Sequence, residues 1–285
     1  MYSIEIKQLE KRTGDFRFGP IDLEFEPDTV TAFIGENGSG KSTLEKLIMN
    51  LIRRDGGEIY VNGTETGGPD ENWKKTISYM PQTIVGCNFL TGKDLKELIS
   101  KWYPTWDEQL FQHLVQLFDL PLNKQFGKLS QGVQQKLFLA LVLARDSDIL
   151  ILDEPTAYID IPARELLMDE LVHWMERGNK TMIIATHQAD HIRKLADYLV
   201  LFQNGKIIGK FEKEELVGKY VCFWLNRPLP PKRIPGEIGR KGEQVVISQC
   251  HEETEQFFKK ENIKWMEKKA LGLEEAITLL LKGRS

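Results

Sequence analysis

Short apolar runs and amphipathic stretches follow one another along this chain, and their order predicts alternating strands and helices. Val30 to Ile34 (VTAFI) is β-branched and apolar, which is typical of a buried strand. Thr43 to Leu51 (TLEKLIMNL) follows with apolar residues at helical spacing. The pattern returns later, where strands over Ile149 to Leu152 and Thr181 to Ala185 enclose a helix over Ala163 to Glu176. This alternation predicts an α/β fold with a parallel, doubly wound sheet.

Further runs predict elements around this sheet. Near the N-terminus apolar and polar residues alternate, which indicates antiparallel strands. From about Cys87 to Phe126 strand signals are absent, and a break at Pro104 separates two expected helices. We also expect strands over Tyr2 to Lys7, Ile21 to Phe25, Glu58 to Val61, Ile77 to Met80, Tyr198 to Phe202 and Lys206 to Lys210, and helices over Lys93 to Trp102, Glu108 to Phe118, Gln131 to Arg145 and Gln188 to Leu195.

The composition changes in the last quarter of the chain. Arg227 to Gly236 (RPLPPKRIPG) carries four prolines and predicts a stiff loop or a domain boundary. Beyond it we expect a strand over residues 244–248, a helix over 252–260, a strand over 263–267 and a helix over 273–281. The prediction is therefore one domain over residues 1–212, with a helical subdomain at about 87–140, and a small C-terminal α/β lobe over 213–285.

The composition narrows the classes of function. The chain has 285 residues of which 41% are hydrophobic, enough for a sizeable core. A net charge of −4 gives no general attraction to nucleic acid. Cys87, Cys222 and Cys250 are widely spaced, which suits reduced thiols in the cytosol. The longest apolar run, Leu137 to Ala144, is far shorter than the roughly 20 residues of a membrane helix, and the N-terminus lacks a signal-peptide core, so we expect a membrane role only through a partner.

One stretch carries a clear chemical pattern. It reads GENGSGKST and satisfies the phosphate-binding pattern G-x-x-x-x-G-K-[ST] between a strand and a helix. Its glycines let the backbone approach a phosphate, whose charge is met by successive N–H groups and by the helix N-terminus. Lys41 is expected to reach the β- and γ-phosphates, and the Ser42 hydroxyl to bind Mg²⁺. The alternative is a glycine-rich turn that binds nothing. The loop residues are Gly35, Glu36, Asn37, Gly38, Ser39, Gly40, Lys41, Ser42 and Thr43.

Three more side chains are expected at strand ends near this loop. The apolar strand Ile149 to Leu152 runs into Asp153 and Glu154, and open α/β sheets bind ligands at the carboxyl ends of their strands. Asp153 is expected to hold Mg²⁺ through water, and Glu154 to polarise a water that attacks the γ-phosphate. His187 follows the next apolar strand and is expected to donate to that phosphate. Taken alone, the Asp-Glu pair is equally typical of an ordinary strand end, and a lone histidine is usually structural.

Two other stretches are weaker signals. Gln82 lies between the phosphate loop and the predicted helical insertion, where its amide is available to a ligand. Leu129 to Lys136 (LSQGVQQK) contains Ser130, which is placed to cap the helix that follows it. The same helix N-terminus, with Ser130 and Gly132, is also an anion site. Both interpretations of Ser130 stay open on these residues alone.

The order of these motifs resembles the nucleotide-binding subunit of an ATP-binding cassette (ABC) transporter. The phosphate loop, Gln82, LSQGVQQK, ILILDEP, Asp160 and His187 carry the resemblance, which covers roughly residues 2–212. It implies a P-loop NTPase fold with a RecA-like core, an antiparallel β subdomain and a helical subdomain. It also implies that two cassettes enclose two ATP molecules head to tail.

The resemblance assigns roles to single positions. The phosphate loop holds the phosphates of the nucleotide. Gln82 is implied to contact the metal and to relay to the membrane partner, and Asp153 to bind the metal. Glu154 is implied to be the catalytic base, and His187 to be the switch that senses the γ-phosphate. Ser130 and Gly132 are implied to contact the γ-phosphate of the opposite cassette, and Asp160 to belong to a loop that crosses the dimer interface.

The chain departs from the family pattern at several positions. The family signature usually reads LSGGQ, whereas Gln131 and Val133 replace a glycine and a glutamine here. The interface loop is usually SGLD, and here it reads AYID over Ala157 to Asp160. In the family an aromatic residue stacks on adenine, and in this chain Thr13 occupies the position of that residue. Phe16 and Phe18 are the nearest rings, and we expect Phe16 to stack.

The looser signature resembles those of exporter-type ABC ATPases, and Leu273 to Glu275 is similar to a C-terminal motif of their small lobes. We therefore expect an ATPase that uses ATP and Mg²⁺ and powers transport, in the direction of export. Its expected partners are a transmembrane permease subunit and a second copy of itself or a related cassette. It is expected in the cytoplasm, on the inner face of the cell membrane through that partner, with no nucleic-acid partner.

Two other classes of function are considered. One is a soluble ABC ATPase that acts on nucleic acid or ribosomes without transport. Such relatives typically carry two cassettes, zinc inserts or long coiled coils, and this sequence shows one cassette and none of those inserts. The other is a regulatory nucleotide sensor without turnover, which the presence of Glu154 and His187 disfavours.

Overall fold

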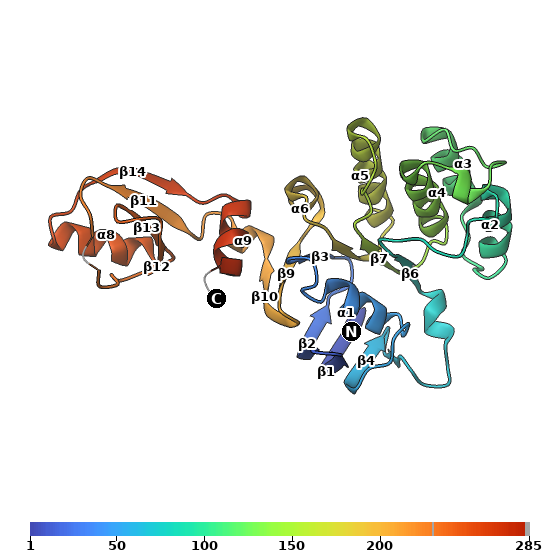
Figure 1. The fold of residues 1–285 in the computed structure, drawn as a ribbon, viewed down its shortest axis with the longest axis horizontal. Helices are drawn as coiled ribbons and strands as arrows, with labels where there is room; N and C mark the ends of the chain where they lie inside the picture. Colours follow the sequence, from blue (N-terminus) through green and yellow to red (C-terminus); the bar gives the residue numbers. More distant parts are fainter. Residues whose placement is uncertain (230, 283–285) are drawn as a thin grey trace. The chain divides into compact units, whose positions relative to one another are not determined.

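The computed structural model of the protein describes residues 1–229 and 231–282 and is a mixed α/β structure (Figure 1). Its internal contacts divide the chain into two compact units. The first unit contains Met1–Ala196 and Phe202–Ile207, and the second contains Asp197–Leu201 and the described chain from Ile208 onward. The predicted boundary at residue 212 stays a prediction.

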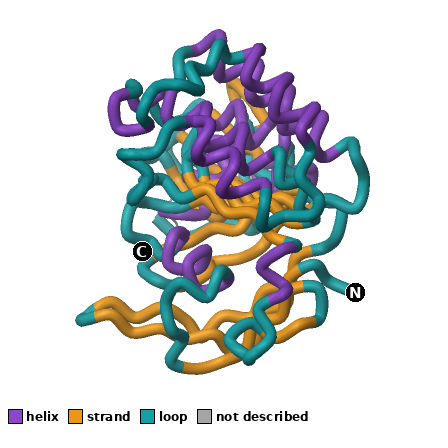
Figure 2. Tube along the Cα trace, turned by 90° about the vertical axis from the view of Figure 1, so that its right-hand side faces the viewer, coloured by secondary structure: helices purple, strands orange, loops and turns teal. Residues whose placement is uncertain are grey.

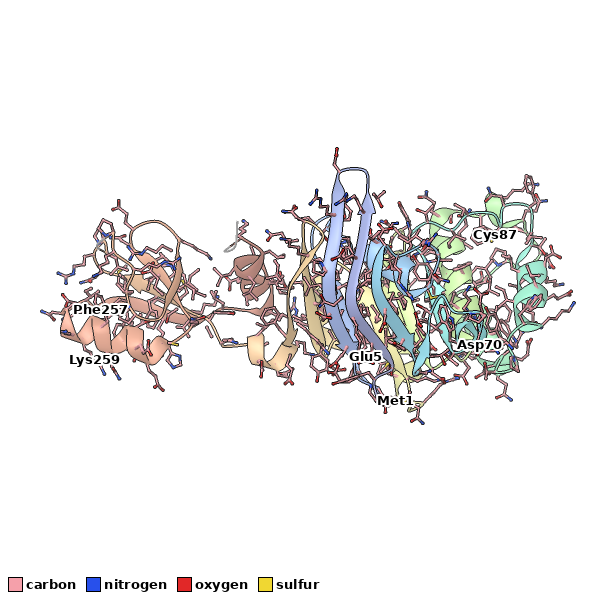
Figure 3. The ribbon with its side chains drawn as sticks, turned by 90° about the horizontal axis from the view of Figure 1, so that it is seen from below. Met1, Glu5, Asp70, Cys87, Phe257 and Lys259 are labelled. Atoms are coloured by element: carbon pink, nitrogen blue, oxygen red, sulfur yellow. The ribbon has the colours of Figure 1, made fainter. Side chains whose placement is uncertain are left out.

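The N-terminal sheet of the first unit is antiparallel, with strands in the order β2-β1-β4-β5. β1 and β2 form a long hairpin, visible in Figure 3. It is longer than the sequence predicted, because β2 begins at Phe16 and runs through Gly19, whereas the prediction began this strand at Ile21. Gly19 approaches β1 so closely that a Cβ would lie 2.0 Å from the Leu9 carbonyl oxygen. The strands are β1 Ile4–Thr13, β2 Phe16–Phe25, β4 Gly56–Val61 and β5 Thr64–Glu65.

The central sheet contains four adjacent parallel strands in the order β3-β8-β7-β6, within the full order β10-β9-β3-β8-β7-β6. Every residue of β3, β7 and β8 is buried. Burial on both faces explains why these strands appear in the sequence as continuous apolar runs. The strands are β3 Val30–Ile34, β6 Ile77–Met80, β7 Ile149–Asp153, β8 Thr181–Ala185, β9 Tyr198–Gln203 and β10 Lys206–Glu212.

Helices of the first unit cover the central sheet. α3, α4 and α5 lie on one side of β6 and β7, and β1, β2 and β4 lie on the other (Figures 1 and 2). The predicted helical region after Cys87 is present, and Thr91 and Asp94 form a capping box at the start of α2. The helices are α1 Lys41–Ile48, α2 Gly92–Ser100, α3 Glu108–Leu117, α4 Gln131–Leu143, α5 Ile161–Met175 and α6 Ala189–Leu195, with 3₁₀ turns η1 Asn72–Lys75 and η2 Phe126–Lys128.

The second unit contains an antiparallel sheet in the order β12-β13-β11-β14, with helices α7, α8 and α9. Phe223 on β11 packs edge-on against Phe258 on α8, with ring centroids 5.4 Å apart. The sequence missed β11 (VCFWL), because a short apolar run does not distinguish a strand from a buried helix, and it missed β12, which follows the prolines. The elements are α7 Lys213–Leu216, β11 Val221–Leu225, β12 Glu237–Arg240, β13 Val245–Ser248, α8 His251–Lys260, β14 Trp265–Ala270 and α9 Leu273–Lys282.

Candidate functional site

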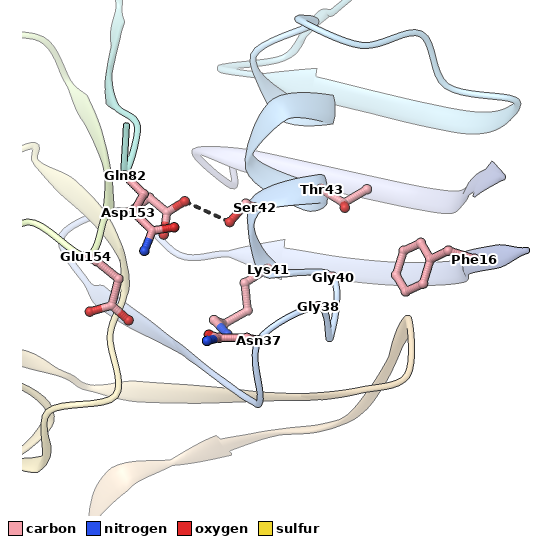
Figure 4. Close-up of a pocket in the computed structure, with 10 residues that line it drawn as sticks. All are labelled: Phe16, Asn37, Gly38, Gly40, Lys41, Ser42, Thr43, Gln82, Asp153 and Glu154. Carbon is pink, nitrogen blue, oxygen red and sulfur yellow. Dashed lines mark hydrogen bonds between the residues drawn. The ribbon is translucent and has the colours of Figure 1, made fainter. Parts of the chain in front are cut away.

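A cavity of about 580 Å³ lies where the phosphate loop meets the carboxyl end of β7 (Figure 4). All of its lining residues are among those predicted from the sequence, so the structure brings predicted residues from four segments into one place. The lining residues are Phe16, Asn37, Gly38, Gly40, Lys41, Ser42, Thr43, Gln82, Asp153 and Glu154. Their assigned roles stay predictions.

The phosphate loop connects β3 to α1 through a tight turn. At Gly35 a Cβ would lie 2.5 Å from the Phe202 carbonyl oxygen, and at Gly40 it would lie 2.7 Å from the Phe18 ring. Gly40 also has a φ of 115°, in the region that favours glycine. α1 begins at Lys41 with no side-chain cap, so the N–H groups of its first turn are left for an anion.

Lys41 is folded over the loop. Its Nζ donates hydrogen bonds to the Gly35 carbonyl oxygen at 2.7 Å and to that of Glu36 at 3.1 Å. Burial lowers the pKa of the Lys41 ammonium, and the charges of Glu154 and Asp153 act in the opposite direction. A phosphate in the cavity would offer this ammonium a charged acceptor in place of two carbonyls.

Ser42 and Asp153 meet at the base of the cavity. The Ser42 hydroxyl donates to Asp153 Oδ2 at 2.7 Å, and Gln82 also lines the cavity. A hydroxyl, a carboxylate and an amide oxygen are hard donors that suit Mg²⁺, which usually takes a few protein ligands and completes its shell with waters and phosphate oxygens. Within residues 1–229 and 231–282, no group of three or more His, Cys, Asp or Glu could hold a metal by itself. The hydroxyl, carboxylate and amide oxygens of Ser42, Asp153 and Gln82 fit Mg²⁺ by their chemistry.

Glu154 and His187 form a pair across the ends of β7 and β8. His187 Nδ1 lies 2.8 Å from Glu154 Oε1, and the His187 side chain is 79% exposed. The other carboxylate oxygen, Oε2, is buried and has no hydrogen-bond partner among the described residues. One oxygen of Glu154 is thus paired with His187, and the other has no partner among the described residues.

The structure favours Phe16 over Phe18 as the ring available to a ligand. Phe16 lines the cavity, on the far side of the phosphate loop from Glu154 (Figure 4). Phe18 is buried, and its ring fills the space beside Gly40. The nucleobase of a nucleotide bound along the loop would therefore contact Phe16.

Ser130, Gly132 and Asp160 do not line this cavity. Ser130 is exposed at the N-terminus of α4, and the helix has no side-chain cap there. Of the two interpretations that the sequence left open for Ser130, the side-chain cap is not observed, and the Ser130 side chain is exposed. Asp160 instead caps α5, because it accepts from Ala163 N–H at 3.0 Å, and this hydrogen bond lowers the pKa of Asp160.

Sequence reasoning missed a buried carboxyl behind the cavity. Glu45 on α1 is 0% exposed, and neither carboxyl oxygen has a hydrogen-bond partner among the described residues. Burial, together with the nearby charge of Asp153, raises the pKa of Glu45 well above its usual value. The signal was present, since Glu45 shares the buried helix face of Leu44 and Ile48.

A hydrogen-bond network that sequence reasoning also missed links the segment after β7 to the segment after β8. His191 is buried, with its ring nitrogens 3.5 Å from Thr156 Oγ1 and 3.3 Å from Thr186 Oγ1. Gln188 Nε2 donates to Thr156 Oγ1, and Arg164 donates to Gln188 Oε1. Burial and the charge of Arg164 lower the pKa of His191 to about 4.

Comparison with known proteins gives these features a family context. A protein-family model described as "ABC transporter" matches residues 18–157. The petrobactin import ATP-binding protein YclP of Bacillus subtilis (strain 168) is 32% identical over 228 residues, which cover 75% of this chain and 88% of YclP. The ABC transporter ATP-binding protein YtrB of the same organism is 25% identical over 290 residues, covering 99% of both chains. Among solved structures, the dimeric ATP-binding cassette MJ0796 bound to ADP and Pi has a TM-score of 0.65 at 21% identity, covering 73% of this chain and 98% of that one.

Proposed function

The chain belongs to the ATP-binding proteins of ABC transporters, whose cassettes hydrolyse ATP, and from this membership we propose that the cavity described above binds ATP with Mg²⁺ and drives a transport cycle. The observation that carries the proposal is the meeting of Lys41, Ser42, Asp153 and Glu154 in one cavity. Each of these residue types meets a need of phosphoryl transfer: countercharge, metal binding and orientation of the attacking water.

The phosphates would lie against the loop and the N-terminus of α1. Lys41 would turn from the two loop carbonyls to the β- and γ-phosphates. Ser42, Asp153 and Gln82 would hold Mg²⁺, which supplies positive charge to the phosphate oxygens. The Asp153 carboxylate already lies within hydrogen-bond distance of the Ser42 hydroxyl, so little movement is needed to share an ion.

Glu154 would act on the attacking water. Glu154 lines the cavity, and His187 lies within hydrogen-bond distance of one oxygen of its carboxylate, while the other oxygen, Oε2, has no partner among the described residues. His187 is exposed and therefore free to turn toward a γ-phosphate when one is bound. Phe16 would stack on the base, and Ser130, Gly132 and Asp160 would face the nucleotide of a second cassette.

The proposed partners are a transmembrane permease subunit and a second cassette. No helix within residues 1–229 and 231–282 has the length and apolar character to cross a membrane. Attachment at the cytoplasmic face of the membrane would therefore come through the permease. The alternative of an ABC ATPase acting on nucleic acid or ribosomes is not favoured, because the relatives are named for transport.

The direction of transport stays a prediction. Export was expected from the looser signature and the C-terminal lobe. YclP and the zinc uptake protein ZnuC of Bacillus subtilis (strain 168) are named for import and uptake, so they do not support export. YtrB, which matches the chain over its full length, has no direction in its name.

Affinity capture of the tagged chain from membranes tests the proposal. We expect a multispanning membrane protein to co-purify, and we expect the complex to resist a high-salt wash because an apolar contact holds it. A matched capture with Lys41→Ala controls for nucleotide-independent attachment. Recovery of the chain with nucleic acid or ribosomes, and with no membrane protein, would contradict a transport role.

A further inference from the structure

Gln135 connects the helix α4 to the residue proposed as catalytic base. The side chain lies five residues beyond Ser130 and is 3% exposed. Its Nε2 donates to the Glu154 carbonyl oxygen at 3.2 Å and to the Pro155 carbonyl oxygen at 3.3 Å. Both acceptors belong to the main chain, so the contact fixes the backbone at Glu154 and leaves the carboxylate free.

The backbone of Glu154 is in a conformation that needs support. Its φ is 50°, in the left-handed region that non-glycine residues adopt at a cost. Its N–H donates to the Ala185 carbonyl oxygen at 2.9 Å, and its carbonyl oxygen also accepts from Ala157 N–H at 3.0 Å. A rotation at this residue would swing the carboxylate, because the Cα–Cβ bond follows the backbone.

A second contact of α4 meets the same segment. At Gly132 a Cβ would lie 2.5 Å from the Tyr158 carbonyl oxygen, so the helix packs directly on that turn. Tyr158 also has a positive φ, of 64°. α4 therefore touches residues 154, 155 and 158, and a displacement of its N-terminal turns would reach Glu154 through direct contacts.

We propose that Gln135 is a positioning residue for hydrolysis, which holds the main chain of Glu154 and thereby transmits the position of α4 to the carboxylate of the same subunit. The proposal rests on the function proposed for Glu154. It adds a physical link between two sites: the N-terminus of α4 faces the nucleotide of the opposite cassette, while Glu154 acts on the subunit's own. Gln135 does not line the cavity, so its effect is on catalysis and not on ATP binding.

The neighbouring residue supplies a matched control. Gln134 lies on the same helix, and its Nε2 also donates to two main-chain carbonyl oxygens, those of Phe126 at 2.9 Å and Leu129 at 3.1 Å. Gln134→Met and Gln135→Met each remove one amide and keep a similar length and helix propensity. The two variants differ in the contact that is lost, because only Gln135→Met removes a hydrogen bond to the main chain of Glu154.

The test is steady-state ATP hydrolysis by the complex with its permease. We expect Gln135→Met to lower kcat by about tenfold or more, since misplacement of a catalytic group by about 1 Å can cost up to about 100-fold. The KM for ATP should stay within about twofold, because the amide makes no contact in the cavity. Gln134→Met should change kcat by less than about twofold. In a Glu154→Gln background, Gln135→Met should cause no further loss, because both act through one group.

Wild-type kcat in Gln135→Met, or an equal loss in Gln134→Met, would overturn the proposal. If Gln135→Met does not fold by circular dichroism, Gln135→Asn is the second variant, because it keeps the amide on a shorter side chain. It should lower kcat in the same way, and wild-type kcat there would also overturn the proposal. Wild-type turnover in Glu154→Gln alone would instead overturn the function proposed for Glu154, and this proposal with it.

Discussion

His191 is a buried residue whose protonation contributes to the loss of stability in acid. Burial comes first among the causes that lower its pKa to about 4, followed by Arg164, with Asp190 acting in the opposite direction and His187 in the same one. The unfolded chain, with a histidine pKa near 6.5, therefore takes up a proton at a higher pH than the folded chain does. The stability that depends on neutral His191 is present above pH 6.5 and is lost as the pH falls toward 4.

The first prediction is that His191→Gln will flatten this acid loss. Glutamine keeps polar contacts to Thr156 and Thr186 but has no proton to gain between pH 6.5 and 4. The measurement is the free energy of urea unfolding against pH, with both proteins compared first at pH 8 to fix the cost of the substitution itself. Parallel curves for the two proteins between pH 6.5 and 4 would contradict the assignment.

Single residues also mark where sequence reasoning succeeded and where it stopped. The phosphate loop, Asp153 and Glu154 were predictable because their spacing is tied to a strand, a turn and a helix. Phe16 was preferred over Phe18 from the sequence without a physical reason, and the structure supplies one, because Phe18 is buried against Gly40 while Phe16 lines the cavity. The sequence left two interpretations of Ser130 open, because serine is a common capping residue, and only the geometry shows that its side chain makes no capping hydrogen bond.

The loop before α2 is the element that presents apolar side chains to solvent. Phe89 is 87% exposed and Val85 is 78% exposed, so neither side chain belongs to the hydrophobic core. Cys87, labelled in Figure 3, lies between them. Exposed apolar side chains this close together indicate a contact surface for another protein, and we propose that the permease binds here.

The second prediction is that Phe89→Asp will uncouple the subunit from its permease. Because Phe89 is exposed, the thermal midpoint and the basal ATPase rate should stay close to those of the wild type, while capture of the permease is lost. Leu51→Asp, at an exposed apolar position after α1, is the matched control and should retain capture. A joint fall of stability and basal ATPase in Phe89→Asp would mean that the side chain is structural.

At the level of elements, the accuracy of prediction depended on how clear the pattern of apolar residues was. The strands β3, β7 and β8 were expected within a residue, because a fully buried strand is apolar throughout. β2 was predicted too short, because a glycine was not expected inside a strand. Gly19 is needed there because β1 passes so close that a side chain would meet the Leu9 carbonyl oxygen, and the local sequence does not reveal this neighbour. β11 was missed because its short apolar run does not distinguish a strand from a buried helix, and β12 (EIGR) was missed because it has neither an apolar run nor an alternating pattern.

The whole molecule is expected to work as a pair of cassettes. Gln131 is exposed beside Ser130, and Val133 is half-buried, so both departures from the family signature lie at the N-terminus of α4. A glutamine in place of glycine adds bulk where a phosphate must approach, and a valine removes an amide contact. Closure of two cassettes over ATP should therefore be weak in the isolated subunit.

The third prediction follows from this arrangement. In sedimentation with MgATP, Glu154→Gln should be a monomer or a loose dimer, whereas the same protein with Gln131→Gly and Val133→Gln should dimerise more tightly. Low basal ATPase that rises with the permease is the corresponding kinetic expectation. Equal dimerisation of the two proteins would mean that the departures are neutral.

The central claim is that this chain hydrolyses ATP with Glu154 as the group that activates water. The most direct measurement is steady-state ATP turnover beside equilibrium ATP binding for the wild type, Glu154→Gln and Lys41→Ala, each with Mg²⁺. Glu154→Gln should bind ATP like the wild type and turn it over at least about 100-fold more slowly, since a positioned acid–base group contributes on that order, and Lys41→Ala should lose binding. Wild-type turnover in Glu154→Gln would contradict the account.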